Sequence, residues 1–144
     1  MKIMVMNGPN LNLLGQREPG LYGNKTLPEI EESLRSLGTE LNIDIVCFQS
    51  NIEGELVDAL QEAGRECQGV ILNAGAYTHT SVAVRDAVSA IRIPVVEVHL
   101  TNPAAREEFR RVSLLSDVAA GSVAGFGAES YTLALLWFSR LRAA

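Results

Sequence analysis

Short apolar runs alternate with longer amphipathic segments along the chain. The apolar runs cover residues 2–6, 43–48, 69–74 and 94–100, and a weaker run lies within 118–123. Near-continuous apolar runs of this length are typical of strands in a parallel sheet that helices cover on both faces. The pattern therefore predicts four parallel strands and a weaker fifth.

Helical periodicity fills the intervals between these runs. Between residues 27 and 41, apolar side chains recur every three or four positions and share one helix face: Leu27, Ile30, Leu34, Leu37 and Leu41. Thr26 and Glu29 have the spacing of a capping box, so this helix should begin after Thr26. Further helices are predicted over 54–67, 80–91 and 130–141, with a short one over 103–111. Strands and helices in alternation give a layered α/β fold with right-handed crossovers.

Length and composition are those of an ordinary globular domain. The chain has 144 residues, 47% of them apolar and 20% charged, so we expect one domain over residues 1–144. Lys and Arg number 12 against 17 Asp and Glu, a formal net charge of −5. Because phosphate affinity depends on clustered basic side chains, this balance argues against nucleic-acid binding.

Neither a targeting signal nor a metal motif is evident in the sequence. The apolar stretch before Asn7 is shorter than the core of a signal peptide, and no run approaches the roughly 20 apolar residues of a membrane span. Cys47 and Cys67 form no CxxC pair, and the chain has two histidines, which argues against a zinc site. We expect a reduced, cytoplasmic protein with no membrane contact.

Polar side chains follow three of the predicted strands. Asn7, Asn10 and Asn12 come after the first strand, Asn73 ends the third, and Glu97 and His99 end the fourth. In open parallel sheets, ligands bind outside the carboxyl ends of the strands, where the strand order reverses. These residues therefore predict a polar ligand crevice at that edge.

The loop over residues 7–23 is longer than the two to six residues, roughly, that usually join a strand to a helix. It carries Arg17 and Tyr22. A solvated arginine and a packed tyrosine are the plainer interpretation. Alternatively, Arg17 lies near the Tyr22 hydroxyl and favours the phenolate, the form of tyrosine that acts as a general base. Three glycines between residues 13 and 23 favour mobility of this loop when the site is empty.

The segment that begins at Asn73 joins the third strand to a helix. Gly75 permits a tight turn there, and Thr80 or Ser81 can cap the helix. A capped turn with a buried amide and a ligand site formed by Asn73 and His79 are equally compatible with this pattern.

Arg106 and Arg110 are four residues apart and would share one face of a short helix. The pattern favours a solvated face, paired with Glu107 and Asp117, over a clamp on an anionic ligand. Asp86 is another charged helical position that by default faces solvent.

Glu97 and His99 are two residues apart on a predicted strand, so their side chains point to the same face. A carboxylate beside an imidazole fixes its tautomer and favours its protonated form. A charged residue among valines is costly unless it is paired. We therefore prefer a functional Glu97–His99 pair over a purely structural one.

Four segments together resemble the type II 3-dehydroquinate dehydratases. They are NGPNLNLLGQREPGLYG, NAGAYTHTSVAVRDA, EVHLTN and AAREEFRRVSLLS, and they occur in the order of that family over essentially the whole chain. The resemblance implies a flavodoxin-like, three-layer α/β fold with a five-stranded parallel sheet. It also implies a dodecamer of four trimers and no metal or other cofactor.

The activity implied by the resemblance is dehydration of 3-dehydroquinate to 3-dehydroshikimate by anti elimination through an enolate. By motif, Tyr22 resembles the base and Arg17 the residue that holds it as phenolate. His99 resembles the acid that protonates the leaving hydroxyl, oriented by Glu97, and Asn10 resembles the residue that stabilises the enolate.

The remaining matches concern substrate binding. Asn73, His79 and Arg110 match binding positions of the family, and the backbone at Leu100 and Thr101 matches the site of the substrate carboxylate. Asp86 matches a position that reaches the active site of a neighbouring subunit.

The chain departs from the usual family pattern at five positions outside the predicted catalytic set: Ala74, Pro103, Ala104, Val112 and Leu114. Two alternatives to the dehydratase interpretation are a catalytically altered family member and a flavodoxin-like protein that binds a nucleotide, flavin or other small ligand. The first lacks its signature, because Arg17, Tyr22 and His99 are all present. The second is disfavoured because the first loop offers few glycines and Pro9 lacks an amide donor.

Overall fold

The computed structural model describes residues 1–143, built around a five-stranded parallel sheet. Its strands are β1 (Lys2–Asn7), β2 (Asp44–Gln49), β3 (Gly69–Asn73), β4 (Val95–His99) and β5 (Gly121–Ala124). The strand order β2-β1-β3-β4-β5 is that of flavodoxin-like folds, so the predicted fold class is confirmed. The order reverses between β1 and β3, which places a crevice at their carboxyl ends.

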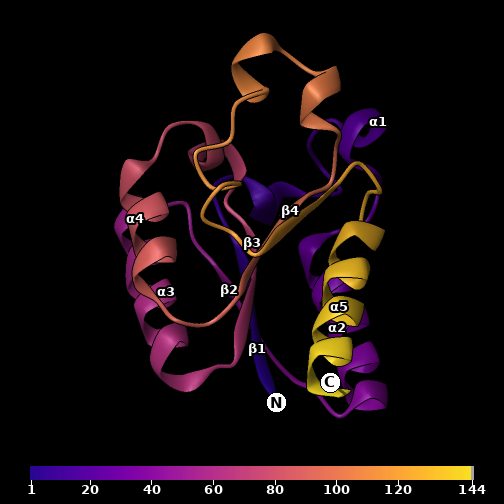
Figure 1. Ribbon diagram of the computed structural model, residues 1–144. Helices are drawn as coiled ribbons and strands as arrows, with labels where there is room; N and C mark the ends of the chain where they lie inside the picture. Colours follow the sequence, from indigo (N-terminus) through magenta and orange to yellow (C-terminus); the bar gives the residue numbers. More distant parts are fainter. Residues whose placement is uncertain (144) are drawn as a thin grey trace.

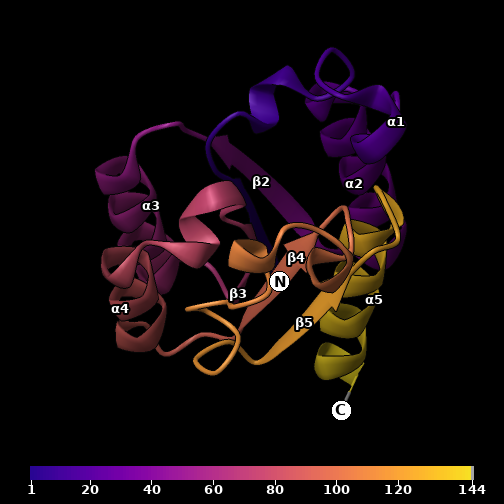
Figure 2. The ribbon, with the colours of Figure 1, turned by 90° about the horizontal axis from the view of Figure 1, so that it is seen from above.

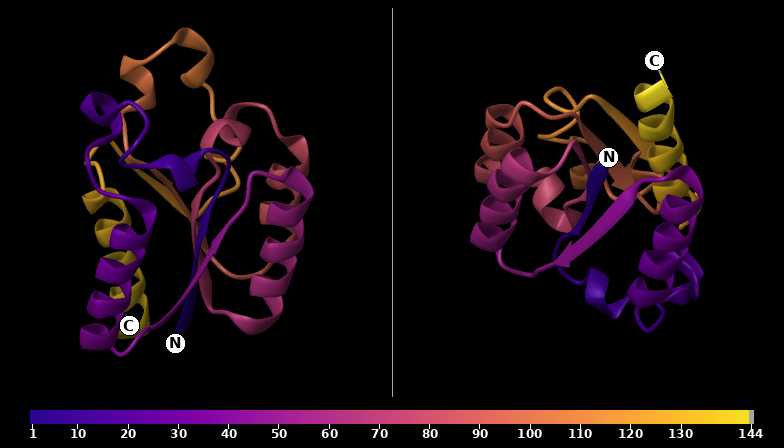
Figure 3. Two further views of the ribbon diagram at one scale, coloured as in Figure 1. Left: turned by 180° about the vertical axis from the view of Figure 1, so that it is seen from behind. Right: turned by 90° about the horizontal axis from the view of Figure 1, so that it is seen from below.

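Helices cover both faces of the sheet and make three layers. Figures 1 and 2 show α2 (Leu27–Leu41) and α5 (Glu129–Ala143) on one face, with α3 (Glu53–Glu66) and α4 (Val82–Ala90) on the other. The views from behind and below in Figure 3 show the same arrangement. Within residues 1–143, no helix has both the length and the apolar character needed to cross a membrane.

Local sequence explains where these helices begin. Thr26 and Glu29 form the predicted capping box at the start of α2. Helix α4 begins at Val82 rather than at residue 80, because the Ser81 hydroxyl accepts a hydrogen bond from the Val84 amide at 2.9 Å.

Strand β5 begins later than the apolar run that predicted it. The amides of Val118 and Ala119 both donate to the Leu115 carbonyl, so this part of the run forms a turn. Pairing with β4 starts at Gly121, which lies opposite Val96. The existence of the fifth strand was therefore predicted correctly, but three of its residues belong to the turn before it.

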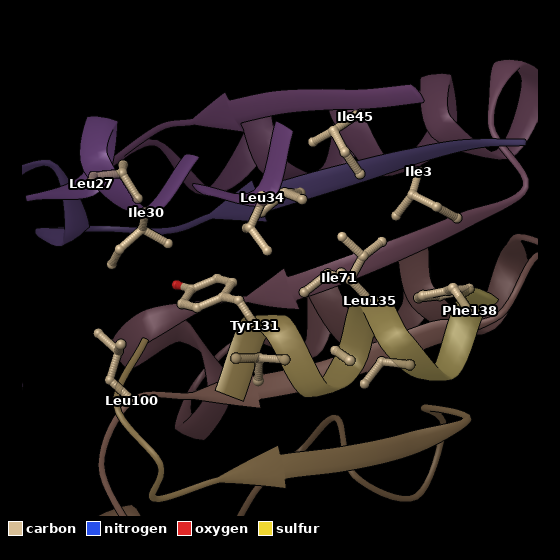
Figure 4. Close-up of a cluster of buried hydrophobic side chains, with 14 of the residues drawn as sticks. Ile3, Leu27, Ile30, Leu34, Ile45, Ile71, Leu100, Tyr131, Leu135 and Phe138 are labelled. Carbon is tan, nitrogen blue, oxygen red and sulfur yellow. The ribbon is translucent and has the colours of Figure 1, made fainter. Parts of the chain in front are cut away.

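Apolar side chains from the sheet and from α2 and α5 form one of the two cores. Tyr131, Leu135 and Phe138 of α5 lie against Ile3 and Ile71 of the sheet (Figure 4). The side chains of these five residues are fully buried. Helix α5 is therefore anchored firmly, and with it the Tyr131 hydroxyl, which bonds to residues at the carboxyl ends of the strands.

Candidate active site

A cleft opens at the carboxyl ends of β1, β3 and β4, where the predicted site residues converge. Of the residues that the family resemblance assigns to the site, all except Glu97 and Asp86 line it: Asn10, Arg17, Tyr22, Asn73, His79, His99, Leu100, Thr101 and Arg110. The segment over residues 102–111, which stands above the sheet in Figure 1, borders the cleft with Pro103 and Arg106 as well. The strand-end rule thus located the cleft, although Asn12 is exposed and lies outside its lining.

The first loop has more structure than its sequence predicted. After β1 it forms a 3₁₀ helix (Leu11–Leu13) and then the short helix α1 (Pro19–Tyr22). Asn10 takes a left-handed backbone with φ 69°, a conformation that asparagine tolerates well. The backbone amide of Asn10 donates to Asn51 Oδ1 at 3.0 Å, which fixes the start of the loop beside the cleft.

Two guanidinium groups lie over the ring of Tyr22. Arg17 Cζ is 5.3 Å and Arg106 Cζ is 5.2 Å from the ring centroid. Both are cation–π contacts, so two positive charges lie against this aromatic side chain at the cleft. The Arg17 contact agrees with the alternative offered for this loop rather than with the plainer solvated arginine, and Arg106 was assigned to a solvated face.

The prediction of a short helix over 103–111 is wrong. The segment instead forms two 3₁₀ helices, Pro103–Ala105 and Glu108–Arg110, separated by extended backbone at Arg106. The Asn102 side chain caps the first by accepting from the Ala104 amide at 3.2 Å, and Arg106 then turns to donate to Thr101 Oγ1 at 3.4 Å. The hydrogen bonds of Asn102 and Arg106 thus break the continuous helix that the spacing of the arginines predicted.

Arg106 and Arg110 show features of both interpretations offered for them, a solvated face and a clamp on a ligand. Arg110 pairs with Glu107, as a solvated face would, yet both Arg106 and Arg110 line the cleft. Asp117, the other expected partner, pairs instead with Arg85 of α4.

His99 and Glu97 form the pair that their spacing predicted. His99 Nε2 and Glu97 Oε2 are 2.8 Å apart, and the Glu97 residue is 1% exposed. Three serines that the sequence did not single out also donate to this carboxylate: Ser113, Ser116 and Ser122. Burial alone would raise the pKa of Glu97, but the hydrogen bonds from His99, Ser113 and Ser116 outweigh it and lower that pKa to about 2. Glu97 is therefore a fixed negative charge directly behind His99.

Asn73 is held by a buried network that sequence patterns did not reveal. Asn73 Nδ2 donates to the Tyr131 hydroxyl at 2.9 Å, and that hydroxyl donates to Asn7 Oδ1 at 2.5 Å. Asn73 Oδ1 accepts from the Gly75 amide at 3.2 Å, where Gly75 has the positive φ of a tight turn. Burial raises the pKa of Tyr131, so its hydroxyl stays neutral and keeps donating. The orientation of the Asn73 amide at the cleft is thereby set from α5.

His79 lies across the cleft from β4, with its ring 6.4 Å from that of His99. Its Nδ1 is 2.7 Å from the Val112 carbonyl oxygen. That contact uses the backbone of Val112, so the family departure at this position leaves it intact. Asp86 lies exposed on α4 and outside the cleft of its own chain.

Side chains suited to metal or thiol chemistry do not gather at the cleft. In the part of the chain that the structure describes, no group of three or more His, Cys, Asp or Glu is placed to hold a metal ion. Both cysteines are free, and burial, reinforced by Glu31, raises the pKa of the Cys47 thiol to about 12. The ionisable groups of the cleft are instead the tyrosine, histidine and arginine side chains already described.

Gly8 allows the ends of β1 and β3 to approach closely at the cleft. Its amide donates to the Asn73 carbonyl at 2.8 Å, and an added Cβ would lie 2.4 Å from the Ala74 carbonyl oxygen. We expect Gly8→Ala to lower the free energy of unfolding by about 1–3 kcal/mol, the usual cost of overpacking, and to displace Asn73. Urea unfolding measures the first effect and KM the second.

Gly54→Ala is the matched control for Gly8→Ala. Gly54 lies exposed on α3, and an added Cβ there meets nothing within 4 Å. This change should stabilise the helix slightly and leave KM unchanged. Equal unfolding curves for the two variants would show that the close contact at Gly8 is unimportant.

Comparison with known proteins agrees with this geometry. The family model for dehydroquinase class II matches residues 1–139. A 3-dehydroquinate dehydratase from Pelotomaculum thermopropionicum is 56% identical over 135 residues, which cover 94% of each chain. One from Prochlorococcus marinus is 54% identical and covers 94% of this chain and 92% of its own. The type II dehydroquinase of Butyrivibrio crossotus superposes with a TM-score of 0.94 at 42% identity, over 95% of this chain and 96% of that one.

Fold and cleft together define a flavodoxin-like α/β enzyme in which Tyr22, Arg17 and His99 face one ligand crevice and Glu97 lies behind His99. The chain belongs to the dehydroquinase class II family. The resemblance drawn from its four motifs is thereby confirmed.

Proposed function

We propose that the protein dehydrates 3-dehydroquinate to 3-dehydroshikimate by anti elimination through an enolate. The observation that carries the proposal is the convergence of Tyr22, under two guanidinium groups, and of the Glu97–His99 pair on a single cleft. Removing a proton beside a carbonyl and expelling a hydroxyl requires a base, an acid and stabilisation of the enolate. The curated relatives that bear the name 3-dehydroquinate dehydratase support the same substrate.

Each step has a residue assigned to it. Tyr22, held as phenolate by Arg17, removes the proton from C2, and the electron pair of that bond forms the enolate. Asn10 stabilises the enolate oxygen. As the carbonyl re-forms, the electrons expel the C1 hydroxyl, which takes a proton from His99 and leaves as water. Glu97 holds the imidazole in place throughout.

Substrate binding is assigned to the rest of the cleft. Asn73, His79 and Arg110 bind the hydroxyl groups and the ring, and the backbone at Leu100 and Thr101 receives the carboxylate. Asp86 reaches the cleft of a neighbouring subunit in a dodecamer of four trimers. A single domain over residues 1–144, the absence of a cofactor requirement and a cytoplasmic location complete the proposal.

A flavodoxin-like binding function finds less support at the same edge of the sheet. Phosphate recognition by a strand-to-helix turn needs free backbone amides. Here the amides of Gly8, Asn10 and Leu11 are already bonded, to the Asn73 carbonyl, the Asn51 side chain and the Gly8 carbonyl. Flavin absorbance in the purified protein would favour this alternative.

The direct test is the appearance of a conjugated enone, followed by its ultraviolet absorbance, when the purified protein meets 3-dehydroquinate. We expect turnover that survives EDTA, because the proposed steps use side chains alone. Turnover should also survive borohydride added with substrate. The only lysines are Lys2, at the opposite end of β1, and Lys25, outside the cleft lining, so neither is placed to form an imine. Strict dependence on a divalent metal, or inactivation by borohydride, would contradict the mechanism.

A further inference from the structure

We propose that Ser113, Ser116 and Ser122 form a hydroxyl cradle that positions Glu97 and, through it, the His99 imidazole for proton donation. The inference deepens the proposed function and rests on His99 as the acid. The serines do not line the cleft, so the role we assign to them is to position other groups.

Hydrogen-bond donors saturate the Glu97 carboxylate. Oε1 accepts from Ser116 at 2.5 Å and from Ser122 at 2.9 Å. Oε2 accepts from Ser113 at 2.6 Å and lies 2.8 Å from His99 Nε2. An ionised carboxylate has about four acceptor sites, so each oxygen is fully used. The carboxylate has no freedom to rotate without losing bonds.

The serines come from two separate parts of the chain. Ser113 and Ser116 lie in the segment between the cleft border and β5, whereas Ser122 lies on β5 itself, directly opposite Glu97 in the strand register. Donors from the edge strand β5 and from the segment that precedes it therefore reach Glu97 from different directions. A buried charge of this kind is tolerated only when such donors are present.

Backbone amides set the direction of the Ser113 bond. Ser113 Oγ accepts from the amides of Leu115 and Ser116, each at 3.1 Å. Because both lone pairs of Ser113 Oγ accept these bonds, its hydroxyl proton is donated to Glu97. Ser113 thus acts toward Glu97 as a donor only, which favours a carboxylate over a neutral acid.

This arrangement determines which nitrogen of His99 acts. Because Glu97 is held as an acceptor, the proton between the two groups stays on Nε2 of His99. Nδ1 is then the nitrogen whose proton is gained and given during turnover. Without the cradle, Glu97 can turn away from His99, and the ring loses both its tautomer and its direction.

The test measures kcat and KM for Ser113→Ala, Ser116→Ala and Ser122→Ala with 3-dehydroquinate. We expect each to lower kcat, by about tenfold for the first two, with KM changed less than threefold. Ser122→Thr, which keeps a hydroxyl on a strand, should restore kcat. Ser33→Ala, which removes an exposed serine bond on α2, is the matched control and should change neither constant.

A double-mutant cycle separates positioning from general stability. In a His99→Ala background, Ser116→Ala should lower kcat no further, because the imidazole it positions is gone. An equal loss in both backgrounds, or a triple serine variant that keeps kcat within twofold, would overturn the cradle.

Proton NMR gives a readout that does not depend on turnover. The Nε2 proton of His99 should give a downfield resonance that is absent from His99→Ala and broadened in Ser113→Ala. An unbroadened resonance in the serine variants would overturn the cradle. Full turnover in His99→Ala alone would instead overturn the acid assignment, so the two failures are distinguishable.

Discussion

Replacing Tyr22 by phenylalanine is expected to abolish turnover while leaving the binding of an enolate-like inhibitor largely intact. Phenylalanine keeps the ring that Arg17 and Arg106 cover, so the shape of the cleft and its cation–π contacts survive. What is lost is the only oxygen proposed to take the C2 proton. Enone formation measures the first effect and calorimetry with the inhibitor the second. Residual turnover above about one part in a hundred of wild type, where a general base contributes at least about 10²-fold, would contradict the assignment.

Arg17→Ala is the companion change, because it removes a cation and keeps the phenol. Turnover should fall severely, because the variant removes one of the two cations that lie over the ring of the proposed base. Arg106 lies equally close to the ring and remains in this variant. We therefore expect a larger loss of kcat in Arg17→Ala/Arg106→Ala than in either single variant. Near-normal kcat in the double variant would remove the physical basis for Tyr22 as the base.

Much of the scaffold was predictable because it depends on local and periodic features. The three central strands, β1, β3 and β4, are near-continuous apolar runs that are largely buried. The capping-box spacing of Thr26 and Glu29 marks the start of α2. The Glu97–His99 pair follows from the two-residue period of a strand, which holds wherever that strand lies. The strand-end rule then places the pair at the crevice.

The remainder depends on contacts between distant segments, which a local pattern does not encode. Ser122 meets Glu97 because β5 pairs with β4 in one register. Tyr131 reaches Asn73 across 58 positions of sequence. Arg106 was misjudged because its spacing from Arg110 describes a helix, whereas its contact with Thr101 stabilises extended backbone. Serine, tyrosine and arginine are common on surfaces, so their roles appear only once the partners are located.

His99→Ala should lower turnover by roughly 10² to 10⁴, the usual contribution of one general acid. The leaving hydroxyl would then depart without a proton. Binding should suffer less, because Asn73, His79 and Arg110 remain in the cleft. The measurement is kcat from enone absorbance together with the inhibitor dissociation constant. Near-normal kcat in this variant would show that another group is the acid.

Glu97→Gln should lower kcat less than His99→Ala does, because the imidazole remains. The pKa of Glu97 is lowered to about 2, so wild-type Glu97 keeps its charge throughout any practical assay range. Glutamine removes that charge and turns one end of the group into a donor. The NH2 group of the glutamine then faces hydroxyl or imidazole donors. The side chain therefore loses hydrogen bonds that fixed its orientation, in addition to its charge. We expect an intermediate kcat with KM nearly unchanged. If Glu97→Gln instead matched His99→Ala, the imidazole would be inactive without the carboxylate, and our expectation of a smaller loss would be wrong.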